Sequence, residues 1–266
     1  MKPRKVTLAE GVELWCGDAT KVIPLLEPAH HVFTDPPYED HMHNSKANAR
    51  GIRTDGYESP RSVKFASISK LRPVITPQMV QACSGWLIAF CTPEGIAPWR
   101  DAIEAAGARY KRACFWYKPD SAPQFNGQGP AMAVEAFVTA WCGSGPSRWN
   151  GGGRRNLFEH MTKQPDRDGG HETEKPVPLM GELVTLFSDR GEIVLDPFLG
   201  SGTTGVAAVK SGRKFIGIEK DQAYFDIAVR RVSAALSQPD MFVEIPKPKQ
   251  ESLTAGWPRQ KKEARK

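Results

Sequence analysis

The chain has 266 residues, of which 36 are Lys or Arg and 30 are Asp or Glu, giving a formal net charge of +6 at pH 7. This length suffices for one large α/β domain with a buried core and leaves little room for a second full domain. No apolar run approaches the roughly 18 residues of a membrane span, and polar residues follow the basic start, so we expect a cytoplasmic protein.

Two short apolar runs near the start of the chain each lead to an acidic residue. Val12–Cys16 is followed within two residues by Asp18. His31–Thr34 is followed directly by Asp35. Runs of this length predict buried strands, which places both acids at the carboxyl end of a strand. The polar, aperiodic stretch 39–72 predicts a long loop, and such loops in compact domains are usually functional or mobile.

The middle of the chain alternates between short helical and strand patterns. In chain order we expect a helix over 77–83, a strand over 86–90, a helix over 99–106 closed by Gly107, and strands over 111–117 and 134–141. The stretch 143–170 is rich in Gly, Arg and polar residues, so we expect a second irregular excursion there.

The last third of the chain has the clearest periodicity. Apolar residues at helical spacing over 177–187 predict a helix, with Pro176 tolerated in its first turn. A strand over 192–195, a helix over 203–209, a strand over 214–218 and a helix capped by Asp221 through Leu236 are expected to follow. This βαβα alternation predicts a parallel sheet with a nucleotide-type site at the carboxyl ends of its strands.

The glycine loop, Asp196–Gly205, reads Asp-Pro-Phe-Leu-Gly-Ser-Gly-Thr-Thr-Gly and joins a predicted strand to a predicted helix. Gly200 and Gly202 permit close approach of the backbone to a ligand and a tight turn. The lysine of a phosphate-binding loop is missing, and the third glycine comes too soon for a dinucleotide fingerprint. A small zwitterionic ligand without phosphate fits better. Glu219 ends the next strand about twenty residues later, where an acid can hold ribose hydroxyls.

A second motif, Asp35-Pro36-Pro37-Tyr38, follows the strand that ends at Thr34. Two consecutive prolines remove two backbone donors and stiffen the turn. What remains is a carboxylate, a proline carbonyl and an aromatic ring, which together fit a planar exocyclic amine. Accepting both N–H groups of such an amine favours the geometry in which its lone pair can attack a methyl sulfonium. Alone, the motif is also compatible with a rigid turn of purely structural role.

The two motifs together resemble those of the amino-methyltransferases that modify adenine N6 or cytosine N4 in DNA. Asp35–Tyr38 is similar to their catalytic motif, and the glycine loop is similar to their S-adenosylmethionine motif. The catalytic motif comes first, which is the order of the circularly permuted beta class. The resemblance covers Val12–Val232 and implies an α/β methyltransferase fold, with a mostly parallel seven-stranded sheet, one antiparallel strand, and helices on both faces.

The resemblance also implies roles for single residues. Asp18 resembles the acid that holds the cofactor's adenine amino group, and Lys175, in Glu174-Lys175-Pro176, resembles the lysine that approaches the methionine carboxylate. Phe198 resembles the aromatic residue of the cofactor motif and Glu219 the ribose acid. The implied catalytic set is Asp35, Pro36, Pro37 and Tyr38. The implied cofactor-binding set is Asp18, Asp35, Lys175, Asp196, Phe198, Gly200, Ser201, Gly202, Thr203 and Glu219.

The implied activity is transfer of a methyl group from S-adenosylmethionine to adenine N6 in double-stranded DNA, with the target base flipped out of the helix. Three alternatives stay open. Cytosine-N4 enzymes of the class more often have Ser where Asp35 stands, and protein amide methylases usually have Asn there. The third is a DNA-binding protein that has kept the fold and lost catalysis. The aromatic segment Phe115–Pro119 resembles the one beside the target base, although core packing explains its aromatics equally well.

Basic residues are concentrated after the catalytic motif. The stretch 43–73 contains seven of them, Lys46, Arg50, Arg53, Arg61, Lys64, Lys70 and Arg72, against two acids. We expect phosphate contacts from Arg50, Arg53 and Arg61, and from Arg154 and Arg155 in the second excursion. The basic tail from Lys247 onward is expected to be a solvated surface.

We expect one methyltransferase domain over 1–240, with 39–72 and 143–170 as loop insertions, and a partly disordered basic tail over 241–266. The region before Glu174 is short for reading several base pairs, so we expect a homodimer whose partner adds DNA contacts. A cognate restriction enzyme is left open. The five cysteines lack C-x-x-C spacing, and displacement at a sulfonium methyl needs no Lewis acid, so no metal is expected.

Overall fold

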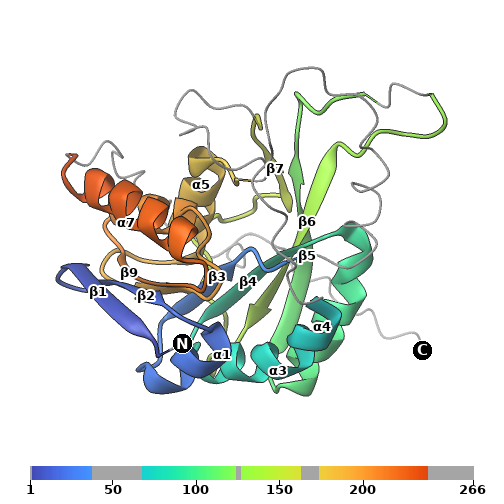
Figure 1. Cartoon of the computed structure of the whole chain (residues 1–266). Helices are drawn as coiled ribbons and strands as arrows, with labels where there is room; N and C mark the ends of the chain where they lie inside the picture. Colours follow the sequence, from blue (N-terminus) through green and yellow to red (C-terminus); the bar gives the residue numbers. More distant parts are fainter. Residues whose placement is uncertain (1, 38–67, 124–126, 163–173, 239–266) are drawn as a thin grey trace, which may run out of the picture.

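The computed structural model of the chain describes residues 2–37, 68–123, 127–162 and 174–238 (Figure 1). Several predictions fall outside the described residues. These are the position of Tyr38, the three arginines Arg50, Arg53 and Arg61, most of the 39–72 insertion, the end of the 143–170 insertion, and the tail beyond residue 238.

Among the described residues, nine strands form one sheet in the order β1-β2-β9-β8-β3-β4-β6-β5-β7. The strands are β1 Arg4–Ala9, β2 Val12–Cys16, β3 His31–Thr34, β4 Trp86–Cys91, β5 Arg109–Tyr117, β6 Val134–Trp141, β7 Leu157–Glu159, β8 Ile193–Asp196 and β9 Lys214–Glu219. β1 is antiparallel to β2, and β6 is antiparallel to both β4 and β5. The remaining pairs are parallel.

The seven central strands, from β2 to β5, carry the one antiparallel strand that was predicted, β6. The predicted total of seven is wrong because each edge of the sheet has one more strand. β1 lies in a basic segment that has no apolar run, and β7 has only three residues, too few to show alternation. β7 pairs in parallel with β5 and buries Phe158, so the 143–170 excursion is not wholly irregular.

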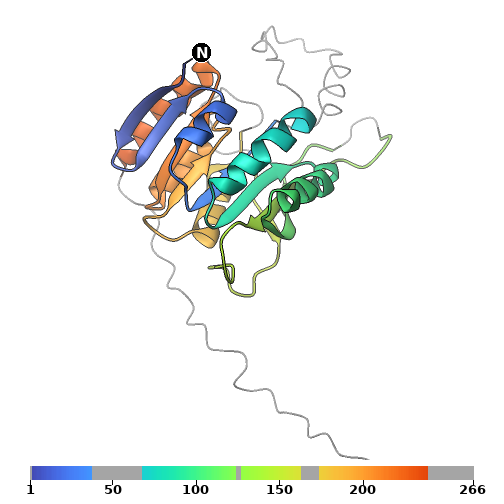
Figure 2. The ribbon, with the colours of Figure 1, turned by 90° about the horizontal axis from the view of Figure 1, so that it is seen from below.

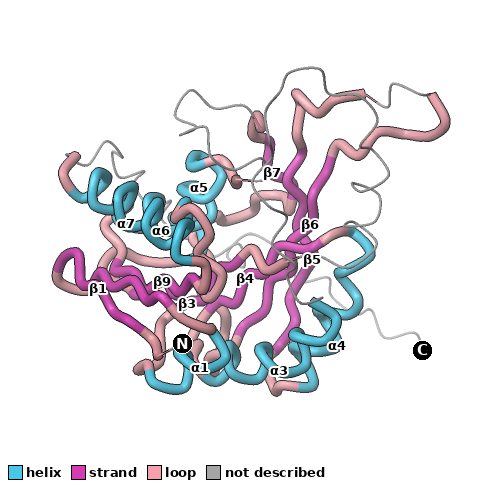
Figure 3. Tube along the Cα trace, viewed as in Figure 1, coloured by secondary structure: helices cyan, strands magenta, loops and turns pink. Residues whose placement is uncertain are grey.

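Helices cover both faces of the sheet (Figures 1 and 2). One face carries α5 Val177–Phe187, α6 Thr203–Lys210 and α7 Gln222–Leu236, and the other carries α1 Ala19–Val22, α3 Ile68–Gln81 and α4 Ile96–Ala105. Figure 3 shows α6 between α5 and α7. None of the helices described here is both long and apolar enough to cross a membrane.

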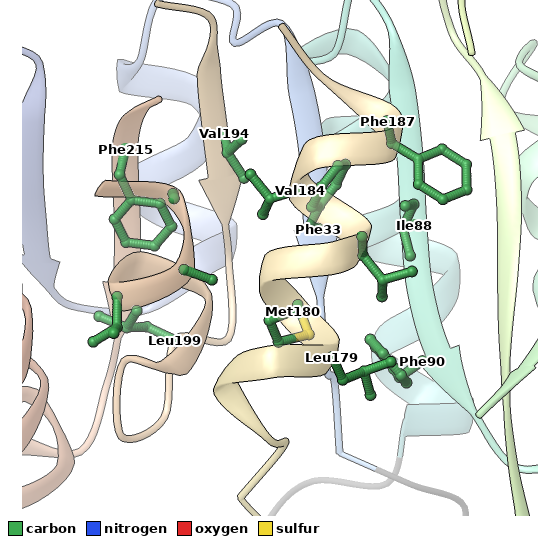
Figure 4. Packing of buried hydrophobic residues seen from close by; sticks show 14 of the residues in the cluster. Phe33, Ile88, Phe90, Leu179, Met180, Val184, Phe187, Val194, Leu199 and Phe215 are labelled. Carbon is green, nitrogen blue, oxygen red and sulfur yellow. The ribbon is translucent and has the colours of Figure 1, made fainter. Parts of the chain in front are cut away.

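The alternation of side chains along β4 divides the interior into two cores. Trp86, Ile88 and Phe90 point to the layer that contains α5, α6 and α7. Leu87 and Ala89 point to the layer that contains α1, α3 and α4. Figure 4 shows the first layer, in which α5 crosses the strands with its apolar side chains directed at the sheet. The central strands β3 and β4 are buried on both faces, which explains their continuous apolar sequences.

The helix α3 differs from the prediction, which had a loop to residue 72 and a helix beginning at Pro77. The helix runs from Ile68 to Gln81 and contains Pro73 and Pro77. A proline inside a helix removes one hydrogen bond and disfavours continuation. The cost is offset because Ile68, Arg72, Ile75 and Met79 recur at helical spacing and are buried.

Phe187, at the end of α5, is the centre of an aromatic cluster, and we expect its truncation to destabilise the whole fold. Its ring packs edge-on against Phe33, Trp86 and Trp149, with centroids 6.4, 5.1 and 4.6 Å away. Phe187→Ala should lower the free energy of unfolding by about 3–5 kcal/mol, measured by urea denaturation. The control Leu236→Ala, at a side chain that is 37% exposed, should have a much smaller effect. Equal effects would contradict this assignment.

Candidate active site

The site lies at the ends of two neighbouring parallel strands whose following connections run to opposite sides. β8 and β3 pair directly, with His31 opposite Val194 and Val32 opposite Leu195. From β8 the chain passes through α6 to β9 on one side, and from β3 it returns through α3 to β4 on the other. Such a switch point leaves a crevice at the carboxyl ends of the strands, where open α/β sheets bind ligands.

The glycine loop follows β8 at this switch point. Gly200 and Gly202 have φ values of +55° and +93°, a region that glycine tolerates best. A Cβ on Gly202 would lie 3.0 Å from the backbone Cα of Ala228 on α7, so only glycine lets α7 approach. A Cβ on Gly200 would meet nothing within 4 Å, so the backbone at Gly200 is open to a ligand.

Glu219, at the end of β9, fixes the glycine loop through its carboxylate. Its Oε2 accepts the N–H of Gly200 at 2.9 Å, and its Oε1 accepts the N–H of Asp221 at 2.8 Å. Burial raises the pKa of Glu219, and the backbone N–H groups oppose that shift. A carboxylate offers about four lone-pair sites, so Glu219 can hold the loop and still accept ligand hydroxyls.

Asp18 lies at the same edge of the sheet as Glu219. Cys16 is opposite Glu219 in the β2–β9 ladder, and the N–H of Gly17 donates to the Glu219 carbonyl at 2.8 Å. Asp18 Oδ1 caps α1 by accepting from the Thr20 hydroxyl at 2.7 Å and from the Thr20 N–H at 2.9 Å. The Thr20 hydroxyl is the main reason that the pKa of Asp18 is lowered. Its exposed carboxylate thus has a structural role beside any role in binding.

Asp196, the last residue of β8, is a buried acid that lies near a second acid, Asp35. Only 2% of its surface is exposed, and its Oδ1 accepts the N–H of Phe198 at 3.1 Å. Burial raises the pKa of Asp196 to about 7, the negative charge of Asp35 adds to the shift, and the hydroxyl of Thr204 opposes it. Near neutral pH this side chain is therefore partly protonated.

Asp35 belongs to a partly buried chain of alternating charges, in which its own side chain is 32% exposed. Lys175, just before α5, places its Nζ 2.5 Å from Asp35 Oδ2 and 2.8 Å from Glu135 Oε1. The Nζ of Lys118 lies 2.6 Å from the other oxygen of Glu135. Burial lowers the pKa of Lys175, but the two carboxylates raise it by more, so the ammonium keeps its proton. We call these four residues, Asp35, Lys175, Glu135 and Lys118, the charge chain.

Arg231, on α7, ties the glycine loop to the segment that contains Lys175. Its Nη1 donates to the backbone oxygen and the hydroxyl of Ser201 at 2.9 and 2.8 Å. Its Nη2 forms an ion pair with Glu174, and the hydroxyl of Thr203 donates to the same carboxylate at 3.0 Å. The ion-paired side chains are 9% and 8% exposed, so α7 rigidly supports the loop.

The remaining sequence candidates have simpler surroundings. Pro36 is buried and Pro37 half-buried directly after Asp35, while Phe198 packs partly buried against the α3–α4 core. In the segment Phe115–Pro119, Trp116 is buried and donates from its indole N–H to the His160 carbonyl at 2.8 Å. This contact favours the packing interpretation for Trp116, whereas Tyr117 is 37% exposed.

The described arginines differ in their availability for phosphate. Arg155 is exposed, and Arg154 is exposed but ion-paired with Glu182 on α5. Arg72, counted in the basic cluster, is buried on α3 with its guanidinium 5.2 Å from the Trp99 ring centre. Arg72 therefore adds nothing to the DNA-facing charge of the basic stretch, because a guanidinium on the inner face of a helix cannot reach a phosphate.

Sequence analysis assigns no individual role to Glu135, Lys118, Glu174 or Arg231. Glu174 precedes Lys175 in the Glu-Lys-Pro motif, and this position is a local signal from which a role for Glu174 could be predicted. Glu135 begins a predicted strand with no motif around it, and its contact with Lys175 is purely tertiary. Across the described ranges, no group of three or more His, Cys, Asp or Glu side chains is placed to hold a metal ion.

A scan against protein families matches residues 29–230 to the DNA methylase family of N6 and N4 enzymes. The type II methyltransferase M2.LlaDCHI of Lactococcus lactis subsp. cremoris is 25% identical over 234 residues, which cover 81% of this chain and 87% of that protein. The DNA adenine methyltransferase YhdJ of Escherichia coli is 47% identical over 78 residues, which cover 29% of this chain and only 26% of YhdJ.

The fold is similar to that of solved methyltransferase structures. The crystal structure of the M1.HpyAVI–SAM complex superposes with a TM-score of 0.64 at 23% identity, covering 83% of this chain and 98% of that one. At this identity the likeness concerns the fold alone. The α/β methyltransferase architecture expected from the sequence is thereby confirmed, and the family match confirms the expected relation to the N6 and N4 DNA methylases.

We expect Asp196 to make stability depend on pH in a direction opposite to that of an ordinary ion-paired acid. Because its pKa is raised to about 7 from 3.8, the folded protein holds this proton more tightly than the unfolded chain does. Its contribution to stability is therefore lost as pH rises through about 4 to 7. Asp196→Asn, a neutral isostere, should flatten the fall of the unfolding free energy between about pH 4 and 7, measured by urea denaturation.

Asp226→Asn is the matched control, since the Asp226 side chain is 62% exposed on α7. It should keep the pH slope of the unmodified protein. An Asp196→Asn variant with that same slope would show that Asp196 is ionised throughout.

Proposed function

The chain belongs to the DNA methylase family, and from that membership we propose that it transfers a methyl group from S-adenosylmethionine to the N6 amino group of adenine in double-stranded DNA. One observation carries the proposal. Asp35 and the glycine loop, far apart in sequence, follow two adjacent parallel strands and so share one crevice at the switch point. A donor and an acceptor of a methyl group must meet in this way.

The residues at the β8 and β9 ends fit S-adenosylmethionine. This cofactor, when bound, supplies a methyl group on a positively charged sulfur. The buried carboxylate of Glu219 suits the ribose hydroxyls, and the open backbone at Gly200 leaves room beside it. Asp18, at the same edge, is the proposed acceptor for the adenine amino group of the cofactor. The other proposed contacts come from Asp196, Phe198, Ser201, Gly202 and Thr203 in the glycine loop.

The proposed role of Lys175 needs a refinement. The resemblance implies that it approaches the methionine carboxylate, while the structure gives its ammonium two protein carboxylates, Asp35 and Glu135. We propose that the main role of Lys175 is to hold the Asp35 carboxylate in place through its ammonium group. Its contact with the cofactor remains a prediction from the resemblance.

Asp35 is the proposed acceptor for one N–H of the target amine, and the Pro36 carbonyl for the other. Holding both N–H groups localises the nitrogen lone pair on the side that faces the methyl donor. Tyr38, which follows in sequence, would stack on the base. A base within the duplex cannot reach this crevice, so we propose that the nucleotide is flipped out, at a cost of a few kcal/mol.

Cytosine N4 is the second candidate substrate, because the family includes both N6 and N4 enzymes. Adenine is favoured because Asp35 stands where cytosine enzymes of the class more often have Ser, and because YhdJ, named an adenine methyltransferase, shares 47% identity over its matched segment. We propose that the protein acts in the cytoplasm, where its DNA substrate is. Whether a cognate restriction enzyme accompanies it stays an open question.

The central prediction concerns Asp35. Asp35→Asn should lower the rate of methyl transfer to DNA by about 100-fold or more, since it removes the charged acceptor for the amine. Affinity for S-adenosylmethionine should stay within about threefold, because most of the proposed cofactor contacts, in the glycine loop and at Glu219, are unchanged. Tritiated methyl incorporation and calorimetry measure the two quantities. Asp101→Asn, at a 65% exposed acid on α4, is the matched control and should behave as the unmodified protein.

Two outcomes would count against this assignment of Asp35. Unchanged transfer in Asp35→Asn would remove the residue from the reaction. Equal losses of transfer and of cofactor affinity would make cofactor binding, and not the reaction, its main role.

The second prediction concerns the basic cluster. Replacing Arg50, Arg53 and Arg61 with Gln should flatten the dependence of log K for DNA on log salt by about one unit per lost phosphate contact. The relative affinity for different DNA sequences should not change. Replacing the tail residues Lys261, Lys262 and Lys266 is the matched control and should leave the slope as it was. The same slope in both triple variants would make the cluster a solvated surface.

The third prediction concerns assembly. Specific DNA recognition generally buries about 1,000 Å² or more of protein surface. Because the excursion before Glu174 is short, one chain has little surface available for reading DNA. We therefore expect a homodimer in which one subunit methylates while the other contacts flanking DNA, with the segments around Arg50 and Arg154 near the shared DNA path. Light scattering at micromolar concentration, with and without DNA, measures the mass. A monomer that methylates one defined DNA sequence would refute the dimer.

A further inference from the structure

Glu135 is a buried carboxylate to which neither motif assigns a role. It is the second residue of β6 and its side chain is 12% exposed. Its two oxygens point at two different ammonium groups, 2.8 Å from Lys175 and 2.6 Å from Lys118. Burial by itself would raise the pKa of Glu135, but Lys175 and Lys118 lower it to about 2. It is therefore an anion at any physiological pH.

Lys175 is held from three sides at the end of the sheet. Asp35 contacts its ammonium from the end of β3, Glu135 from β6, and the ring of Phe90 on β4 lies with its centre 5.0 Å away. Only 7% of its surface is exposed. A lysine side chain has many rotamers, and a second carboxylate at a fixed distance selects one of them.

The charge chain balances two carboxylates against two ammonium groups. A buried charge is costly unless it is paired, so each member depends on its neighbours. Without Glu135, the ammonium of Lys175 would be held by Asp35 alone among these carboxylates. The Lys175 ammonium would then be free to change rotamer, and the Asp35 carboxylate paired with it would no longer be held in one orientation.

We propose that Glu135 is a positioning residue for methyl transfer, which acts through Lys175 to fix the orientation of the Asp35 carboxylate. This inference rests on the proposed function, in which Asp35 accepts an N–H of the target amine. Glu135 itself contacts Lys175 and Lys118, and its effect on the reacting atoms is indirect. Catalytic groups must be held within about 0.5 Å of the productive geometry, and a supporting residue of this kind supplies that precision.

The test compares Glu135→Gln with a matched control. Glu192→Gln removes a carboxylate of nearly equal exposure, 13%, whose pKa is likewise lowered to about 2. Glu192 lies among His31, Arg148 and the Asp189 N–H, at the opposite end of β8. In single-turnover assays, Glu135→Gln should slow methyl transfer by about tenfold or more, while the affinity for S-adenosylmethionine stays within about twofold. Glu192→Gln should transfer at the unmodified rate.

Fluorescence of 2-aminopurine at the target position separates positioning from DNA binding. Base flipping should be unchanged in Glu135→Gln, because the loss is confined to the orientation of Asp35. A slow variant that has also lost flipping, or one that matches Glu192→Gln in rate, would overturn the proposal. If Glu135→Gln does not fold, Glu135→Asp keeps the charge and shortens its reach; its transfer rate should still fall, and an unmodified rate would overturn the proposal.

A second readout needs no activity. Asp35 and Glu135 share one ammonium, so the effects of Asp35→Asn and Glu135→Gln on the free energy of unfolding should be non-additive in a double-mutant cycle. Additive effects would contradict the coupling.

The assays also separate the two proposals. An unmodified protein that methylates no DNA defeats the proposed function and, with it, this inference. An active unmodified protein whose Glu135→Gln variant is equally fast defeats this inference alone.

Discussion

The parallel pairing of β8 with β3 is the constraint on which the site depends. The two strands end at the same level, and their connections then diverge to opposite sides of the sheet. Asp196 and Asp35 therefore come together at the opening of the crevice. The packing of α5 across the strands, with Phe187 in its aromatic cluster, keeps Lys175 at the same opening.

Bringing acids together in a buried edge creates a problem of charge, which this protein solves in three ways. Asp35 is paired with the ammonium of Lys175. Asp196 has its pKa raised to about 7 by burial and is partly protonated. Glu219 accepts two backbone N–H groups. An edge prepared in this way suits a positively charged sulfonium and an amine, since both are stabilised by nearby carboxylates and carbonyls.

Sequence reasoning succeeded where the signal was local. A strand, a turn and an acid follow one another within ten residues around Asp35, and the left-handed Gly202 could be expected from the turn it must make. It failed where a contact joins distant segments. The Lys175–Asp35 pair spans 140 residues, and nothing near Glu135 indicates its partner. A count of charges also misses burial: Arg72 adds to the basic stretch 43–73, but its helical spacing with Ile75 places it on the buried face of α3.

Single-molecule sequencing of DNA from cells that express this chain tests the central claim most directly, because it reports the modified base and its sequence context together. We expect N6-methyladenine at one defined sequence in expressing cells and none there in cells with the empty vector. N4-methylcytosine in its place, or no modified base in the presence of folded protein, would contradict the claim.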